Sequence, residues 1–224
     1  MRTPPRRDES RSWLGSLPSH WAAVPLRFLV SFVGGATPNT GRTEFWGGPI
    51  PWVSPKDMKR EELADAEDHV SELAVASTSL RLIEPEAVLV VVRGMILAHS
   101  FPVAVTTRPL TINQDMKALI CGPRLIPRFL AEYLRAIEPG LVSLAEESAH
   151  GTRKMETETL GGVVISLPPA DEQRAIVELI QRERETHGVL IASVNRTARL
   201  LTERSSALIA AAVTGQFEAA GNGN

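Results

Sequence analysis

The last part of the sequence, from Pro168 to Phe217, has a pattern that predicts one unbroken helix. Proline can open a helix but cannot lie inside one, and no proline follows the pair that starts this run. Asp171 and Glu172 place negative charge on the first turn, where the helix dipole favours it, and Gly215 is a natural stop. A helix from Ala170 to Thr214 would be about 65 Å long, so it needs a partner along its length.

Apolar residues in this run recur at the spacing of helices that pair side by side, with Arg184 and Ser205 as polar members of the repeat. One interpretation is a coiled-coil arm that pairs with a long helix of another subunit. The other is a single helix that lies across its own domain. We favour the coiled coil, because the apolar stripe is longer than a small domain. We predict that the stripe is formed by Ala198, Ala212 and the partner-contacting residues Ile180, His187, Ile191, Val194, Leu201 and Leu208.

The bulk composition limits the classes of protein that the chain can belong to. A net charge of -2 and a pI of about 6.2 argue against an extended basic surface, although charge can be segregated locally. A single cysteine, Cys121, excludes a disulfide framework and a cysteine metal cluster. The apolar runs are too short to span a bilayer, and the charged N-terminus leads into no apolar signal sequence. We therefore expect a cytoplasmic protein without a membrane partner.

Before the long helix, the sequence predicts a globular domain, and the fold class is α+β. We place this domain at residues 13–167, the helix at 168–217, and disordered segments at 1–12 and 218–224. Apolar and β-branched runs predict strands, and an amphipathic pattern predicts a helix over Pro127–Ile137. The predicted strands are Ala87–Val92, Val103–Thr106, Thr111–Ile120 and Val163–Leu167.

Two further segments are less regular. Phe45–Lys59 combines a glycine turn with a strand interrupted by prolines, which argues against a continuous central strand. Glu61–Leu73 is acidic and weakly helical, and its charge makes it a poor surface for nucleic acid.

The sequence has no P-loop for phosphate, no His-Glu-x-x-His motif for zinc and no Gly-x-Ser-x-Gly motif that carries an activated serine. The five histidines share no spacing typical of metal ligands, so we predict no metal and no cofactor. One arrangement suggests catalysis: Glu86, Asp115 and Lys117 loosely match the two acids and lysine of Mg²⁺-dependent nucleases. A metal-dependent DNA nuclease is therefore an alternative function.

Four segments together resemble one family, the specificity subunits of Type I restriction–modification systems. They carry the motifs Trp13-Leu14-Gly15 with Pro18-Ser19-His20-Trp21, Gly35-Ala36-Thr37-Pro38 with Phe45–Asp57, Arg93-Gly94 with Thr111–Asp115, and Ser148–Lys154 running on to Leu167–Arg174. The end of the long helix, Ala207–Gly215, also fits. These motifs span nearly the whole chain in the family's order.

The resemblance implies a target recognition domain followed by a spacer helix, with no catalysis in this subunit. It implies double-stranded DNA as the ligand, and separate modification and restriction subunits, for adenine methylation and cleavage, as partners. The usual family member carries two recognition domains and two spacer helices, whereas this chain has one of each. We therefore expect a half-subunit that pairs through antiparallel helices, with a copy of itself on a gapped palindrome or with another half-subunit.

Within the domain, arginine and the amides of asparagine and glutamine are the side chains that read guanine and adenine edges, and threonine and lysine suit phosphates. Asn113 and Gln114 have a second interpretation as the cap of a strand, and Arg93 as a member of an internal ion pair. A further alternative is a decoy subunit that assembles without reading DNA, which the near-neutral charge favours. The predicted DNA-binding residues are Arg42, Lys56, Arg93, Asn113, Gln114, Thr152, Arg153 and Lys154.

Overall fold

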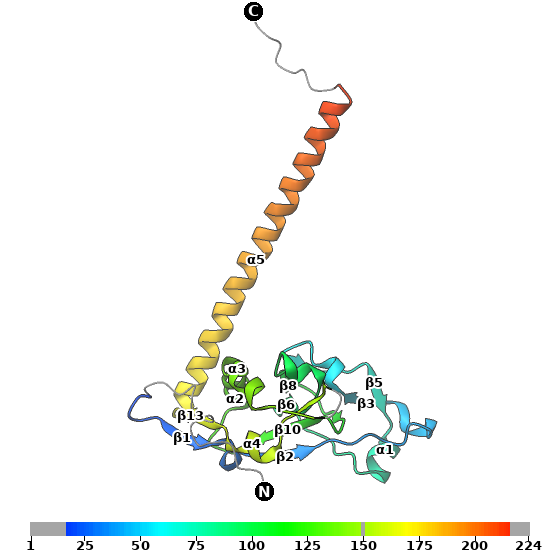
Figure 1. Ribbon diagram of the computed structural model, residues 1–224, viewed down its shortest axis with the longest axis vertical. Coiled ribbons are helices and arrows are strands. Elements are labelled where there is room, and N and C mark those ends of the chain that lie inside the picture. Colours follow the sequence, from blue (N-terminus) through cyan, green and yellow to red (C-terminus); the bar gives the residue numbers. More distant parts are fainter. Residues whose placement is uncertain (1–16, 149–150, 216–224) are drawn as a thin grey trace, which may run out of the picture. The chain divides into compact units, whose positions relative to one another are not determined.

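The structure is a computed structural model, and it describes residues 17–148 and 151–215. The segments 1–12 and 218–224, predicted to be disordered, lie outside these residues, as does the Trp13-Leu14-Gly15 motif. Strands and short helices alternate up to Leu167, and one long helix, α5 (Ala170–Val213), follows. The predicted α+β domain with a long C-terminal helix is confirmed (Figure 1). The chain divides into two compact units after Val177.

A five-stranded sheet forms the centre of the globular unit. Neighbouring strands within this sheet are antiparallel, except that β4 runs parallel to β8. Every residue of β6 and β8 is buried, so the predicted strands over Ala87–Val92 and Val103–Thr106 are confirmed. In spatial order the strands are β2 (Val30–Gly34), β10 (Met116–Cys121), β6 (Val88–Val91), β8 (Val103–Thr106) and β4 (Glu62–Leu63).

Three helices follow this sheet in the sequence: α2 (Pro127–Ala136), α3 (Glu138–Leu144) and α4 (Thr157–Gly162). The predicted helix over Pro127–Ile137 is confirmed as α2 and ends one residue earlier. Phe129, Leu130 and Leu134 on its apolar face are buried in the main core with residues of β6 and β8.

A smaller sheet has the order β5 (Asp68–Val70), β3 (Trp46–Val53) and β9 (Thr111–Ile112), and α1 (Glu72–Ser77) packs beside it. The prediction that prolines prevent a central strand here was wrong. β3 tolerates them because its register to β5 is irregular between Trp46 and Ile50, and its pairing to β9 begins only at Trp52, beyond both prolines. The weakly helical prediction for Glu61–Leu73 was also wrong, because this segment contains β4 and β5.

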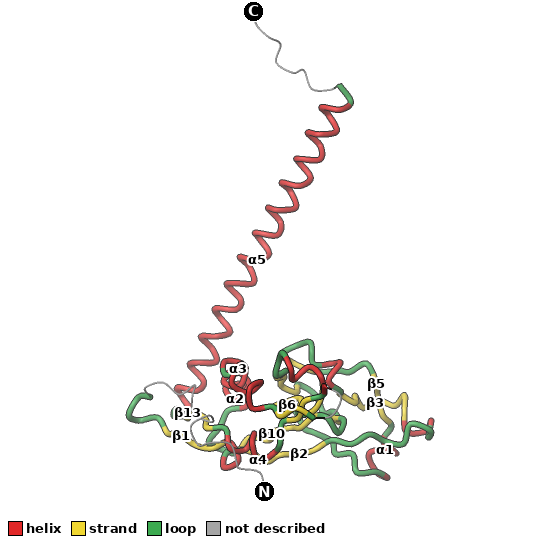
Figure 2. Tube along the Cα trace, viewed as in Figure 1, coloured by secondary structure: helices red, strands yellow, loops and turns green. Residues whose placement is uncertain are grey.

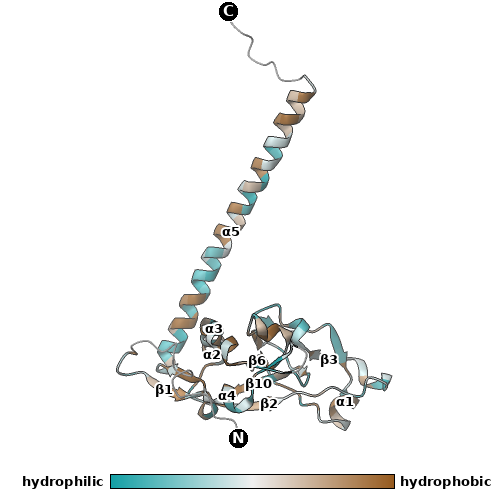
Figure 3. Ribbon diagram, in the orientation of Figure 1, coloured by the Kyte–Doolittle hydropathy of each residue, from teal (hydrophilic) through white to brown (hydrophobic). Residues whose placement is uncertain are grey.

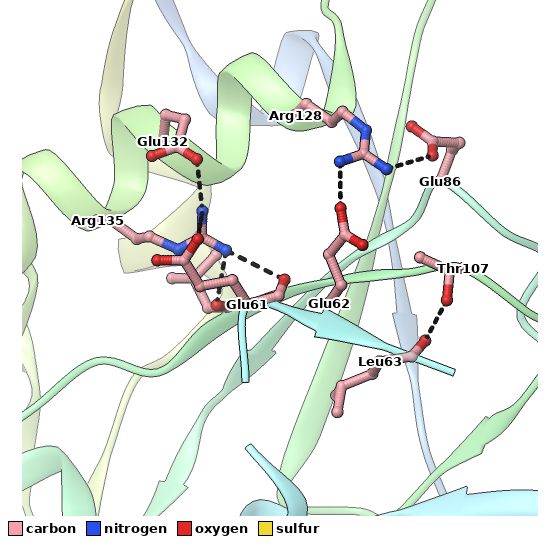
Figure 4. A network of polar contacts seen from close by, with 9 residues as sticks. Glu61, Glu62, Leu63, Glu86, Thr107, Arg128, Glu132 and Arg135 are labelled. Atoms are coloured by element: carbon pink, nitrogen blue, oxygen red, sulfur yellow. Dashed lines mark hydrogen bonds and ion pairs between the residues drawn. The ribbon is translucent and has the colours of Figure 1, made fainter. Parts of the chain in front are cut away.

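Ion pairs from α2 to Glu62 and to the preceding Glu61 hold the short parallel strand β4 against this helix (Figure 4). Arg135 is only 19% exposed; its Nη1 lies 2.8 Å from Glu132 Oε1, and its Nη2 donates to the Val103 and Glu61 carbonyls at 3.1 and 3.2 Å. Arg128, two turns earlier on the same face of α2, donates to the Glu62 carboxylate. These bonds explain how an acidic segment forms an edge strand: the arginines of α2 compensate its charge.

The first turns of α5 belong to the globular unit. Strand β1 (Ala22–Pro25) pairs antiparallel with β13 (Val164–Leu167), the predicted last strand, and α5 begins three residues after β13. Glu172 on the first turn accepts 2.9 Å and 2.8 Å hydrogen bonds from Trp21 Nε1 and His20 Nε2. The bond from Trp21, and then that from His20, holds the pKa of Glu172 below its ordinary value.

Gln173 is fully buried at the start of α5. Its amide nitrogen donates to the carbonyls of Arg124 and Pro168, both at 2.9 Å, and its amide oxygen accepts from the Ile126 N–H at 2.8 Å. Val177, one turn later, is also buried. The side chain of Gln173 thus joins the helix to two separate segments of the domain.

Beyond Val177 the helix continues unbroken to Val213 (Figure 2). Apolar residues recur along it between polar ones (Figure 3). Several of its large apolar side chains are more than half exposed, among them Ile191, Val194 and Leu201 at 60%, 58% and 60%. Among the described residues, no helix combines the length and apolar character needed to cross a membrane.

Candidate nucleic-acid interface

A polar turn, Asn113–Asp115, separates β9 from β10. The sequence predicts one strand over Thr111–Ile120, which was wrong, because a turn that begins at Asn113 interrupts it. Its amide oxygen accepts from the Asp115 N–H at 3.1 Å, and Asn113 is only 6% exposed. The Asp115 carbonyl accepts from the N–H groups of Val92 and Arg93, at 2.8 and 3.2 Å. The turn is therefore fixed to the point where the chain leaves β6.

The loop after β2 packs closely against this turn. A Cβ atom at Gly35 would lie 2.1 Å from the carbonyl oxygen of Asn113, so only glycine fits there. The Trp52 indole donates to the Ala36 carbonyl at 2.9 Å and fixes the loop from the other side. As a result, the Thr37 hydroxyl donates to the side-chain oxygen of Gln114, which is exposed.

Basic residues from distant parts of the sequence meet in a third, three-stranded sheet. Its order is β11 (Glu146–Glu147), β12 (Arg153–Lys154) and β7 (Arg93–Gly94). Lys154 pairs with Arg93, and residues paired in an antiparallel ladder point to the same side. Arg93 and Lys154 therefore share one face of this sheet, and Arg153, paired with Gly94, lies on the other.

Each cation on the shared face has an acidic neighbour. Arg93 is 52% exposed and its Nη1 lies 3.9 Å from Asp115 Oδ1. Lys154 is 39% exposed, and its ammonium lies 2.6 Å from Glu156 Oε1. Exposed pairs of this kind are weak, so both side chains can exchange a carboxylate for a phosphate or a base edge.

Of the remaining predicted residues, Arg42 and Lys56 are placed elsewhere, whereas Thr152 lies next to β12. Arg42 pairs with Glu44 at 2.8 Å and stacks over the Phe45 ring. Lys56 lies 2.8 Å from Asp68 and 3.3 Å from Glu67, and the hydrogen bond to Asp68 raises its pKa. The carbonyl of Thr152 accepts from the Ser148 N–H at 2.7 Å, next to β12. The structure therefore brings together Arg93, Asn113, Gln114, Thr152, Arg153 and Lys154, whereas Arg42 and Lys56 lie in separate ion pairs.

The nuclease arrangement of Glu86, Asp115 and Lys117 was wrong. Glu86 precedes β6, whereas the carbonyl of Asp115 is bonded to the residues that follow it, so the four residues of the strand, about 13 Å, lie between the two acids. The Glu86 carboxylate instead lies 3.5 Å from Arg128, on α2. Within residues 17–148 and 151–215, three metal-binding side chains do not gather at any point.

Sequence reasoning missed two residues beside this cluster. Thr37 belongs to the quoted Gly35-Ala36-Thr37-Pro38 motif but was not selected as a site residue; the signal that could have found it is Gly35, which marks a close approach of backbones. Met95 gave none: it is 70% exposed because Gly94, with a φ of +145°, turns the chain just after Arg93. The place of either residue beside the cluster depends on the pairing of strands that lie far apart in the sequence.

The fold and the cluster define a class of protein in which an α+β domain carries a polar and basic face and ends in a long helix with an exposed apolar stripe. Residues 18–186 match the family described as Type I restriction modification DNA specificity domain, and the chain belongs to this family.

Two relatives illustrate the match. The chain is 33% identical, over 150 residues, to the EcoR124I/EcoR124II specificity subunit of Escherichia coli, covering 66% of this chain and 37% of the relative. It is 28% identical, over 196 residues, to the MjaIX specificity subunit of Methanocaldococcus jannaschii, covering 79% and 42%. The chain thus spans less than half the length of either relative.

Solved structures share the fold. A chain from work on complex assembly and conformational transition of the type I R-M system superposes with a TM-score of 0.72 and 22% identity, covering 89% of this chain and 47% of that one. The HsdS subunit from Thermoanaerobacter tengcongensis gives 0.63 and 20%, covering 84% and 44%.

Proposed function

We propose that this protein reads a sequence in double-stranded DNA and directs the modification and restriction subunits of a Type I system to it. In this role it is not an enzyme: adenine methylation and cleavage belong to its partners, it needs no cofactor, and it works in the cytoplasm, where the DNA is. Its membership of the specificity-domain family over residues 18–186 is the observation that carries the proposal.

We assign the recognition domain to residues 13–167 and the spacer helix to 168–217. In the domain, the DNA face is centred on Arg93, Gln114 and Lys154, which the turn at Asn113–Asp115 and the β7–β12 pair bring close together. Arginine and glutamine side chains can each make two bonds to a base edge, and lysine suits a phosphate. The buried Asn113 positions the turn. Arg42, Lys56, Thr152 and Arg153 would serve at the margin of this face.

The spacer helix supplies the connection to a second recognition domain. We propose that the exposed stripe of α5 is covered by another long helix, from a second copy or from another half-subunit. A gapped, bipartite target follows from two domains held apart by paired helices.

The near-neutral net charge favours one other candidate, a decoy that occupies the modification subunit without reading DNA. Co-expression with the modification subunit, followed by sequencing of methylated adenines, separates the two. A reader gives one methylated motif, whereas a decoy gives none and suppresses the motif of a normal specificity subunit.

Binding to duplexes selected from a random pool tests the DNA face directly. Fluorescence anisotropy should show that Arg93→Ala weakens binding by about ten-fold or more, since a base-reading pair of bonds contributes about 1–3 kcal/mol. Arg153→Ala should weaken binding less. Arg182→Ala, which removes the same charge from the exposed helix, is the matched control. Equal affinity of the Arg93, Arg153 and control variants would remove this face from the proposal.

A further inference from the structure

Two apolar side chains next to the basic cluster are exposed to solvent. Met95 is 70% exposed and Ile96 is 43% exposed, and they begin the short 3-10 helix η5 (Met95–Ala98), directly after β7. Single exposed apolar side chains are common on protein surfaces and need no explanation by themselves. Met95 differs from such residues because its backbone is fixed and cations lie on both sides of it.

The backbone around Met95 is fixed before and after this residue. Gly94 has a φ of +145°, a conformation that favours glycine, and is paired with β12. Leu97 is fully buried in the main core, and the Ile96 carbonyl accepts from the Ser100 N–H at 2.9 Å. The fold therefore presents Met95 on an ordered turn, so that a ligand covering it has little backbone to order.

The strand order places the cations. In the central sheet β6 ends, and β8 and β4 begin, at the same edge, because β6 is antiparallel to β8 and β8 is parallel to β4. Arg93, with Lys154 paired to it, follows β6 at this edge. Lys59 and Arg60, which are exposed, precede β4 at the same edge. β6 and β4 are two strand spacings apart, which is about 10 Å.

A shallow groove connects the second pair of cations with the apolar residues. Its volume is about 250 Å³, and Lys59, Arg60 and Ile96 contribute to its lining. Two carboxylates in the same lining, those of Glu61 and Glu138, lie 3.8 Å from a guanidinium nitrogen of α2 and 2.8 Å from a backbone N–H. These acids therefore have partners within the protein, and the exposed Lys59 and Arg60 can reach a phosphate outside the groove.

We propose that Met95 reads the 5-methyl group of a thymine in the major groove of DNA. This inference rests on the proposed function, because it adds an apolar contact to the DNA face. The major groove is about 12 Å wide and is bordered by phosphates, which matches a row with cations on both sides of an apolar centre. The minor groove, at about 6 Å, is too narrow for this row.

The choice of thymine follows from the chemistry of the major groove. The thymine 5-methyl is the apolar group that a base pair displays there, whereas the other positions are hydrogen-bond donors and acceptors. Methionine has no group suited to those positions, but its unbranched and polarizable side chain adapts to an apolar surface. Lys59 and Arg60 act as phosphate contacts on the side of Met95 away from Arg93.

Uracil replacement tests this contact, because uracil is thymine without the 5-methyl group. Each thymine of a duplex selected from a random pool is replaced in turn, and fluorescence anisotropy measures binding of the full chain. One replacement should weaken binding about four-fold, which corresponds to the burial of one methyl-sized group. With Met95→Ala the same replacement should change the affinity little, because the methyl group has lost its partner. Met95→Leu, which keeps an apolar side chain, should retain the effect.

Phe28 offers a matched control at the opposite edge of the central sheet. It is 69% exposed and precedes β2, whose first residue pairs with the last residue of β10. Phe28→Ala removes a similarly exposed apolar side chain, and it should keep both the affinity and the full effect of the uracil. Because Met95 is exposed, Met95→Ala should have the Tm of the unmodified chain, so that a change in binding is not a change in folding.

Several results would overturn the inference while the proposed function stands. Equal uracil effects in the unmodified chain and in Met95→Ala mean that another residue covers the methyl group. If no uracil duplex binds more weakly and Met95→Ala weakens binding to all of them, the side chain is a wedge between bases. A selected target without thymine also contradicts the inference. A chain that selects no duplex at all contradicts both the inference and the proposed function.

Discussion

The globular unit and the helix beyond Val177 use apolar residues in opposite ways. In the domain, strands such as β6 and β8 have every side chain buried, and they form a continuous core with α2. In the helix, Val189 and Ile209 are 72% and 62% exposed, alongside the stripe itself. The comparison teaches that the domain buries its own apolar side chains, whereas the helix beyond Val177 leaves many of its own exposed, and an isolated helix of this kind is only marginally stable in water.

If the helix depends on a partner, a charge inside the stripe should have the largest effect. Ile191→Asp should abolish self-association, since an unpaired buried charge costs about 3–5 kcal/mol. Sedimentation equilibrium should show a monomer at concentrations where the unmodified chain is dimeric. Val189→Asp, at a residue outside the stripe that is even more exposed, should leave the dimer intact. Equal effects of the two variants would mean that the stripe is not the contact.

If the domain is self-contained, its stability should depend on the buried first turns of α5, where Gln173 lies. Gln173→Ala should lower the free energy of unfolding by about 3 kcal/mol, because it leaves buried backbone groups of Arg124, Ile126 and Pro168 without partners. Urea denaturation followed by tryptophan fluorescence measures it. Gln181→Ala, an exposed glutamine on the same helix, is the control and should change the stability little. A similar loss at both sites would contradict the assigned role of Gln173.

A smaller effect should appear at Glu172, where hydrogen bonds from Trp21 and His20 lower the carboxyl pKa. A group with a lowered folded-state pKa stabilises the fold above its unfolded value, here about 4.5, and this stabilisation is lost as the pH falls toward the folded value. Glu172→Gln should therefore lower the Tm at pH 7, and the difference from the unmodified chain should shrink by pH 4.

The control for this pH dependence is Glu178→Gln, on an exposed turn of the same helix. Thermal unfolding of this variant should follow the unmodified chain at both pH values. A difference at Glu172 that stays constant with pH would show that the charge of its carboxylate contributes nothing.

The parts of the fold predicted from sequence are those set by local pattern. Uniform apolar runs identified β6 and β8, and periodicity identified α2 and α5. β3 escaped prediction because the tolerance of its prolines depends on where β5 and β9 pair with it. The turn at Asn113 was not predicted, because the hydrogen bond from the Asp115 N–H to the Asn113 side chain within it leaves no mark in the pattern of apolar residues.

The same distinction holds for the candidate site. Arg93 and Lys154 could be selected by residue type, but their position on one face follows from the β7–β12 pairing of distant segments. Arg42 and Lys56 have the same chemistry and similar exposed ion pairs, but neither belongs to the β11–β12–β7 sheet, which residue type alone cannot reveal.

The pairing of β1 with β13 has a consequence for how such a protein can change. Ala22 and Leu167 are neighbours in this ladder, so the first and last strands of the globular unit pair with each other just before α5 begins. The chain between these two residues therefore forms a segment that begins and ends at one pair of strands. If the domain reads DNA as we propose, the exchange of this segment for another in a single genetic event would give a new specificity, while β1, β13 and α5 stayed the same.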